Sequence, residues 1–232
     1  MELEPFVFRH EGVLVGARDG GGQEDSVGDE VGAFSLRPLG ADEYAVFTLD
    51  LCHNQLDRHF SRFPDEELEA INRLAPGRPL MERHDLRGTL PRGRFFRSQL
   101  HRDGDRLSVR PDVYVLQTAE NADFILNIEG GVYRETSIGF SFRTPECSIC
   151  ERDLRTCEHV PGRSYGDVLC HYTMRGVLEV IEGSVVSSGS QGTGFVSERR
   201  GAPLADALDR ARRAYHEPVE LWSRAPGGWR EE

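Results

Sequence analysis

Thr136-Ser137-Ile138-Gly139-Phe140-Ser141-Phe142 is the stretch that decides the fold, because this strand candidate joins a helix to a cysteine-rich segment. Upstream, apolar residues on one side of 118–128 predict a helix, which Gly130-Gly131 ends. Downstream, beyond the cysteine-rich segment, residues 168–174 and 177–186 are further strand candidates. The central part of the chain is therefore expected to alternate one helix with several strands.

The same patterns extend toward the N-terminus. Near alternation of apolar residues over 43–51 predicts a strand, and 95–100 and 107–116 are two more candidates. An acidic first turn and apolar residues at helical spacing predict a helix over 64–74, which Pro76-Gly77 ends. Many strands with two internal helices predict an α+β fold, with an antiparallel β-barrel core and flanking helices.

The first 42 residues have weaker signals. Residues 6–8 and 13–15 are short β-like runs, and the Gly/Asp-rich segment 19–29 predicts a mobile loop. The first four residues, Met1-Glu2-Leu3-Glu4, are acidic and lack the charged-then-apolar layout of a secretory signal. The first 42 residues are therefore expected to combine short β-like runs with a mobile loop.

The C-terminal part differs in composition. Residues 187–194 are rich in Ser and Gly and predict a linker, and apolar residues on one face of 204–215 predict a short helix. We therefore expect one domain over 1–186 and a linker with a C-terminal tail over 187–232. A cysteine-rich insertion over 143–166 belongs to the first of these.

Composition excludes several classes of protein. Of the 232 residues, 38% are hydrophobic and 29% charged, so a buried core is expected and wholesale disorder is not. No apolar run approaches the roughly 18 to 20 residues of a membrane-spanning helix. The net charge of -11 argues against direct binding of nucleic acid, which needs a basic surface. All 28 basic residues are Arg, which excludes lysine Schiff bases and P-loop phosphate binding.

The five cysteines are unevenly placed. Cys52 stands alone and is expected to be a small buried apolar residue, whereas the other four lie within residues 147–170. A secreted disulfide scaffold would distribute its cysteines along a short chain. This placement indicates a reducing compartment and a local metal site.

Cys147-x2-Cys150-x6-Cys157-x-His159 has the spacing of a zinc site. A CxxC turn brings two sulfurs to one side of a tight loop, and the second pair completes a Cys3His set. Four protein ligands leave no open position for water, so we expect a structural zinc ion that stabilises the insertion. Two alternatives are open: the four residues are unligated, or Cys170-His171 replaces one ligand.

Three segments carry a resemblance to a known family. They are Arg83-His84-Asp85, Thr136-Ser137-Ile138-Gly139-Phe140, and Leu178 to Val186, which contains Glu182-Gly183-Ser184. In this order and spacing they resemble the prohead (capsid maturation) serine proteases of tailed bacteriophages, which are related in fold to the assemblins of herpesviruses. The resemblance covers about 43–187, and it implies an assemblin-like barrel.

Position by position, the resemblance implies a catalytic triad of Ser137 as nucleophile, His84 as general base and Glu182 as the third member. A serine hydroxyl needs a positioned imidazole to take its proton, and a carboxylate orients that imidazole. Asp85 is an alternative partner for His84. Strand alternation places Ser184 on the face of Glu182, where we assign it no role, and Gly139 is expected to let the backbone approach a substrate.

The resemblance implies a serine endopeptidase that cleaves scaffold and capsid proteins inside an assembling virus prohead, in the host cytoplasm. Its own C-terminal tail is a further candidate substrate, and no membrane partner is expected. The alternative is a catalytically idle, zinc-stapled scaffold or capsid-binding assembly protein, and a zinc-stabilised adaptor is a third. The sequence leaves the oligomeric state open, a dimer included.

Overall fold

The computed structural model describes residues 6–15, 24–188, 190, 222–225 and 228–231. For 6–15, 24–26, 222–225 and 228–231 it describes the backbone alone. The chain divides into two units, Met1–Val196 and Ser197–Glu232, and each is described by itself.

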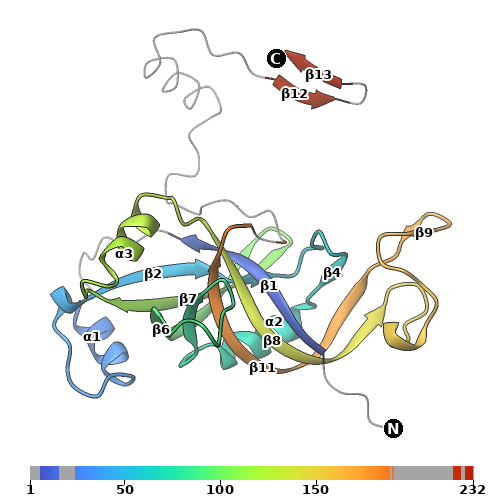
Figure 1. The fold of residues 1–232 in the computed structure, drawn as a ribbon. Coiled ribbons are helices and arrows are strands. Elements are labelled where there is room, and N and C mark those ends of the chain that lie inside the picture. Colours follow the sequence, from blue (N-terminus) through green and yellow to red (C-terminus); the bar gives the residue numbers. More distant parts are fainter. Residues whose placement is uncertain (1–5, 16–23, 189, 191–221, 226–227, 232) are drawn as a thin grey trace. The chain divides into compact units, whose positions relative to one another are not determined.

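The first unit is built on one nine-stranded sheet with few helices (Figure 1), which confirms the predicted α+β class. The strand order is β2-β1-β8-β11-β5-β6-β7-β3, β4 pairs with β11, and β2 also pairs with β7. The strands are β1 (Phe6–Val15), β2 (Tyr44–Asp50), β3 (Cys52–His53), β4 (Ser61–Arg62), β5 (Pro79–Glu82), β6 (Gly93–Asp103), β7 (Arg106–Leu116), β8 (Glu135–Cys147) and β11 (Tyr172–Val186).

The sheet is mixed, which corrects the expectation of a purely antiparallel barrel. Strand β11 pairs in parallel with both β4 and β5, whereas the other pairings of this sheet are antiparallel. The segment from β5 to β11 contains three long strands and a helix, enough chain for β11 to return parallel to β5. This pairing brings the end of β5 beside the end of β11.

Helix α2 (Asp65–Leu74) confirms the prediction for 64–74, with Pro64 as its N-cap. Its apolar side chains Leu68 and Ile71 are fully buried, and the helix contacts β6, β7 and β11. Burying each of them stabilises the fold by about 1.5–3 kcal/mol. The same core contains the largest buried aromatic side chains, which come from four different segments: Phe47, Phe63, Phe95, and the β8 pair Phe140 and Phe142.

Helix α1 (Glu24–Gly32) shows that the predicted loop over 19–29 is wrong for 24–29. Val31 is fully buried in a second apolar cluster with Tyr44, Phe96 and Tyr114. Tertiary packing therefore outweighs the low helix propensity of a segment containing glycine. The second predicted internal helix is α3 (Ala122–Glu129), which begins four residues later than 118–128 predicts.

Strand β11 runs unbroken where the sequence predicts two strands, over 168–174 and 177–186. The strand continues through Gly176, which has a φ of 71°, and its pairing with β8 shifts register after Val177 and again after Val180. The backbone N–H groups of Gly176 and Val177 donate to the Glu67 carboxylate at 2.7 and 2.8 Å. A side chain of α2 thus holds the irregular part of the strand.

The insertion lies between the paired strands β8 and β11, at the right of Figure 1 around β9. It contains the 3₁₀ turn η2 (Leu154–Thr156) and a small hairpin of β9 (Ser164–Tyr165) and β10 (Val168–Leu169). The other 3₁₀ turn, η1 (Ala41–Glu43), precedes β2. Because β8 continues to Cys147, the first candidate metal ligand is on a strand of the main sheet.

In the second unit, β12 (Trp222–Ala225) pairs antiparallel with β13 (Gly228–Glu231). The helix predicted over 204–215 and most of the linker predicted over 187–194 lie outside the described residues. Among the helices that the structure describes, none combines the length and the apolar content of a membrane-spanning segment.

Candidate active site and metal centre

The structure brings Ser137, His84 and Glu182 into one hydrogen-bonded chain. His84 Nε2 lies 2.5 Å from Ser137 Oγ, and His84 Nδ1 lies 2.5 Å from Glu182 Oε1. The imidazole therefore bridges a hydroxyl and a carboxylate that are 53 and 98 residues away from it in the sequence. This is the arrangement in which a serine can pass its proton to a histidine whose tautomer a carboxylate fixes.

His84 is held by a turn just after β5. Both Arg83 and His84 have positive φ values, 54° and 57°, which non-glycine residues adopt only at a cost. Two hydrogen bonds from β11 offset that cost: Arg83 N donates to Val185 O at 2.9 Å, and His84 N donates to Ser184 Oγ at 3.0 Å. The turn directs the imidazole back over β8 and β11.

Ser137 and Glu182 come from the neighbouring strands β8 and β11. In their antiparallel register Ser137 is opposite Ser184, and Gly139 is opposite Glu182. A Cβ atom on residue 139 would lie only 2.3 Å from Glu182 Oε1. Glycine at this position makes room for the Glu182 carboxylate. That Gly139 also lets the backbone approach a substrate stays a prediction.

The site is buried. Ser137 and Ser184 are fully buried, and Glu182 and His84 are 1% and 8% exposed. Burying a carboxylate is costly unless hydrogen bonds compensate, and both Glu182 oxygens have a partner. Oε1 contacts His84, and Oε2 accepts a hydrogen bond from Ser184 Oγ at 2.5 Å.

Asp85 does not replace Glu182 as the partner of His84. Its carboxylate accepts hydrogen bonds from the backbone N–H groups of Arg87 and Gly88, at 3.2 and 2.6 Å. Asp85 therefore stabilises the loop that follows the turn. Of the two carboxylates proposed to orient His84, the structure brings only Glu182 to the ring.

Gly139→Ala is expected to disable the site by displacing Glu182. The new methyl group would overlap a carboxylate oxygen, and β-sheet backbone on both sides prevents relief by a small shift. We expect the rate of reaction of Ser137 with a fluorophosphonate probe to fall at least about 100-fold. Gly28→Ala is the matched control, because a Cβ there meets nothing within 4 Å. An unchanged rate for Gly139→Ala would contradict this account of Gly139.

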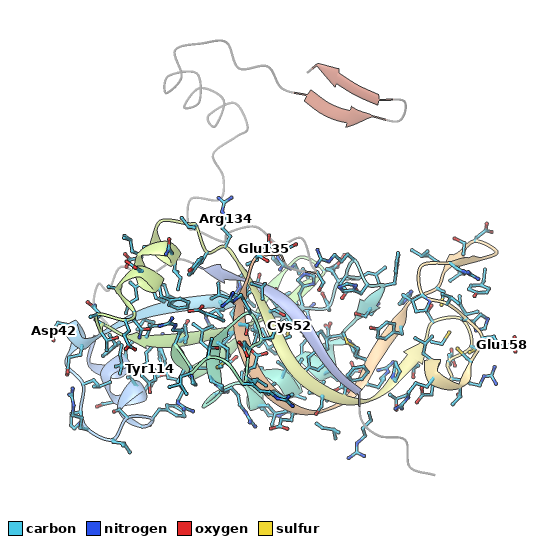
Figure 2. The ribbon with its side chains drawn as sticks, viewed as in Figure 1. Asp42, Cys52, Tyr114, Arg134, Glu135 and Glu158 are labelled. Carbon is cyan, nitrogen blue, oxygen red and sulfur yellow. The ribbon has the colours of Figure 1, made fainter. Side chains whose placement is uncertain are left out.

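A cavity of about 550 Å³ lies where β5 and β11 end and β8 begins, and its lining contains Arg83, the sequence neighbour of His84, but none of the triad residues. Figure 2 labels Arg134 and Glu135 at the start of β8. Five of the nine residues that line the cavity are polar or charged, three are valines and one is a tyrosine, and each of the three segments that carry the triad contributes to the lining. The lining residues are Glu82, Arg83, Val132, Tyr133, Arg134, Glu135, Val185, Val186 and Ser187.

The four predicted metal ligands also come together. One ligand atom from each of Cys147, Cys150, Cys157 and His159 lies within 4.8 Å of the others, a cluster that could hold a metal ion. Backbone N–H groups point at the thiols: Ile149 N donates to Cys147 Sγ at 3.4 Å, and the N–H groups two residues after Cys150 and Cys157 do the same. Figure 2 shows this insertion around the labelled Glu158.

The chemistry of these residues suits a metal. His159 Nδ1 is buried and has no hydrogen-bond partner among the described residues. The backbone N–H of Arg152 is the main cause that lowers the pKa of the Cys150 thiol to about 6, which favours the thiolate that a metal binds. Burial, and next the adjacent Cys147, raises the pKa of the Cys170 thiol to about 11. Cys170 is not among the four residues whose ligand atoms come together.

Among the described residues, Cys52, His53, His59 and His101 belong neither to the hydrogen-bonded triad nor to the metal cluster. Cys52 is fully buried in the main core, as expected, and burial raises the pKa of its thiol well above the ordinary value. His59 and His101 are exposed. His53 is 4% exposed, and its Nδ1 accepts a hydrogen bond from Gln55 N at 3.1 Å.

Ser184 is the site residue whose importance the sequence analysis misses. Alternation along the strand correctly places its side chain on the face of Glu182, and this was the available signal. Alternation cannot predict the second hydrogen bond of Ser184, which its Oγ accepts from the backbone N–H of His84, just beyond the end of β5.

No protein-family model matches this chain, and no curated protein or solved structure matches it.

Proposed function

We propose that the chain is a serine endopeptidase with Ser137 as nucleophile, His84 as general base and Glu182 as the residue that orients His84. The observation that carries the proposal is the His84 ring, with one nitrogen 2.5 Å from a serine hydroxyl and the other 2.5 Å from a buried carboxylate. The resemblance to phage prohead proteases adds the substrate class: scaffold and capsid proteins in an assembling prohead, and the chain's own C-terminal tail.

The proposed reaction proceeds by acyl transfer. Ser137 Oγ bonds to the scissile carbonyl carbon while its proton passes to His84 Nε2, and Glu182 Oε1 accepts the Nδ1–H of the resulting imidazolium. His84 then gives the proton to the leaving amine as the carbon–nitrogen bond breaks. Water, deprotonated by His84, releases the acyl group and restores Ser137. The cavity beside Arg83 and Arg134 would receive substrate residues near the scissile bond.

We further propose that the metal is zinc and that its role is structural. Three thiolates and one imidazole are the ligands of a closed tetrahedral zinc site. Ser137 and Cys147 are ten residues apart on β8, which is about 30 Å along a strand. The ion would therefore hold the insertion together without taking part in the reaction of Ser137.

One observation favours the alternative, a catalytically idle scaffold or capsid-binding assembly protein that zinc stabilises. Ser137 is fully buried, so a substrate reaches it only after the site opens. An idle relative would keep the hydrogen-bonded chain for stability alone. The two functions differ in whether Ser137 reacts in the native protein.

Labelling with a fluorophosphonate tests the proposal. The native protein should gain one covalent adduct, at Ser137. Trypsin releases residues 135–143 as one peptide, because Arg134 and Arg143 bound it. That peptide also contains Ser141, so fragmentation must assign the adduct. A native protein that stays unlabelled, both alone and together with scaffold and capsid proteins, would favour the idle assembly protein.

Glu182→Gln is expected to slow labelling about 1,000- to 10,000-fold, less than loss of the nucleophile would. Glutamine keeps the shape and can still hydrogen-bond His84, but it carries no charge to stabilise the imidazolium. The measurement is the second-order rate constant with the probe. Glu179→Gln is the control, because Glu179 is an exposed residue of the same strand whose partner is Arg78, at 3.2 Å. Equal rates for the two variants would remove Glu182 from the mechanism.

A further inference from the structure

Ser184 has two hydrogen bonds that join parts of the site otherwise separate in the fold. Its Oγ donates to Glu182 Oε2 at 2.5 Å and accepts from the backbone N–H of His84 at 3.0 Å. The residue is fully buried. A serine hydroxyl has one hydrogen to donate, so here that hydrogen is committed to the carboxylate. We propose that Ser184 is a positioning residue that fixes Glu182 and His84 relative to each other, an inference that rests on the proposed function.

The first part of this role concerns the carboxylate. Glu182 is 1% exposed, and of its two oxygens one faces His84 and the other accepts from Ser184. With two fixed partners the carboxylate plane cannot turn, and Oε1 stays aimed at Nδ1. Without the Ser184 hydroxyl, Oε2 loses its hydrogen-bond donor in a buried site, and the carboxylate is free to rotate toward other donors.

The second part concerns the strained turn. His84 has a φ of 57°, so its backbone persists there only because the surroundings hold it. The His84 N–H donates to Ser184 Oγ, and the neighbouring Arg83 N–H donates to Val185 O. Two consecutive residues of β11 thus hold the two residues with positive φ. Because Ser184 also binds Glu182, the same hydroxyl fixes both the position of the His84 backbone, and with it the imidazole, and the orientation of the Glu182 carboxylate.

The chain of hydrogen bonds has a direction. It runs from the His84 N–H to Ser184 Oγ, and from the Ser184 hydroxyl to Glu182 Oε2, and each donor polarises the next. The hydroxyl hydrogen of Ser184 therefore points at the carboxylate and fixes the position of Glu182 Oε2. The hydrogen bonds of Ser184 go to Glu182 and to the backbone of His84, so we infer that it acts through these two residues.

The test is a double-mutant cycle with the fluorophosphonate rate as readout. We expect Ser184→Ala to lower the rate about 10- to 100-fold, the range for residues that orient a functional group. If Ser184 acts through Glu182, the double variant with Glu182→Gln should react about as slowly as Glu182→Gln alone. Ser184→Ala should also shift or broaden the downfield proton NMR signal of the His84 Nδ1–H, a signature that a general loss of stability does not produce.

Ser61→Ala is the matched control. Ser61 is also a fully buried serine that donates to a carboxylate, Asp57 Oδ2 at 2.8 Å, but β4 pairs with the opposite end of β11. It should lose stability like Ser184→Ala while keeping the wild-type rate and NMR signal. Should Ser184→Ala fail to fold, Ser184→Cys keeps the volume and weakens the donor. It should then show the same loss of rate.

Two results would overturn the inference. One is a rate for folded Ser184→Ala or Ser184→Cys within about twofold of wild type, and the other is full additivity with Glu182→Gln. Both presuppose that wild-type Ser137 reacts. A wild-type protein that does not react at all would overturn the proposed function and this inference with it, so the two failures are distinguishable.

Discussion

Ser137→Ala and His84→Ala should each abolish cleavage of the scaffold or capsid partner, with a loss of at least about 10,000-fold. In a Ser-His-carboxylate triad the members act as one unit, so removing the nucleophile or the base costs nearly the whole catalytic effect. His84 contacts both other members at 2.5 Å, which is why its loss should be as severe as that of Ser137. The measurement is the appearance of cleaved partner on co-expression, followed by mass spectrometry of its new termini.

Two controls separate loss of chemistry from loss of fold. Ser141→Ala changes another serine of β8 that is 9% exposed, and His59→Ala changes an exposed histidine. Both should cleave at the wild-type rate, and all four variants should melt cooperatively. Cleavage that survives Ser137→Ala would assign the nucleophile elsewhere. No cleavage by the wild type would support the idle assembly protein.

Local sequence patterns were enough to predict several of the helices and strands. The alternation over 43–51 and the acidic first turn over 64–74 found β2 and α2, because each signal is complete within one segment. Local patterns failed where contacts between residues far apart in the sequence decide the structure. Helix α1 forms where Val31 enters a cluster with side chains 13 or more residues away, and β11 stays continuous because α2 supports its irregular part.

The candidate site was predictable in its members and unpredictable in its geometry. The resemblance supplied Ser137, His84 and Glu182, since spacing alone could not choose among 8 histidines and 39 carboxylates. The positive φ of His84 depends on hydrogen bonds from β11, and the parallel pairing that supplies them joins residues about 100 apart. No local pattern encodes such a contact. The need for glycine at 139 likewise appears only once Glu182 lies opposite it.

The metal cluster is the opposite case, because its chemistry is local. Its four residues span only positions 147–159, and a CxxC turn has few ways to fold around an ion. The spacing therefore predicted the set of residues that the structure brings together. What the spacing did not predict is the N–H group aimed at each thiol or the raised pKa of the Cys170 thiol.

Removing the metal, by a chelator or by Cys150→Ser, should unfold the insertion and leave the triad intact. A structural zinc site contributes on the order of 10 kcal/mol to the folding of its segment. Between Cys150 and Cys157, Leu154 packs against the main core, and the other residues are polar and at least partly exposed, so little apolar burial holds them without the ion. We expect about one metal ion per chain in the untreated protein.

Limited trypsin digestion makes that unfolding visible. The chain has no lysine, and Arg152 and Arg155 lie inside the metal loop. In the folded insertion, Arg155 is held by an ion pair with Asp153 at 2.6 Å and by a hydrogen bond to Arg143 O at 2.9 Å. Chelation or Cys150→Ser should open both sites to trypsin, whereas Cys52→Ala, in the main core, should keep the metal and the protection.

The fluorophosphonate rate completes this experiment, because it separates a structural ion from a catalytic one. With about 30 Å of β8 between Cys147 and Ser137, metal loss should change the labelling rate less than about threefold while the insertion is being cut. A labelling rate that falls in step with metal removal would instead tie the ion to the reaction. A protein that contains no metal and resists trypsin equally with and without chelator would show that the four residues are unligated.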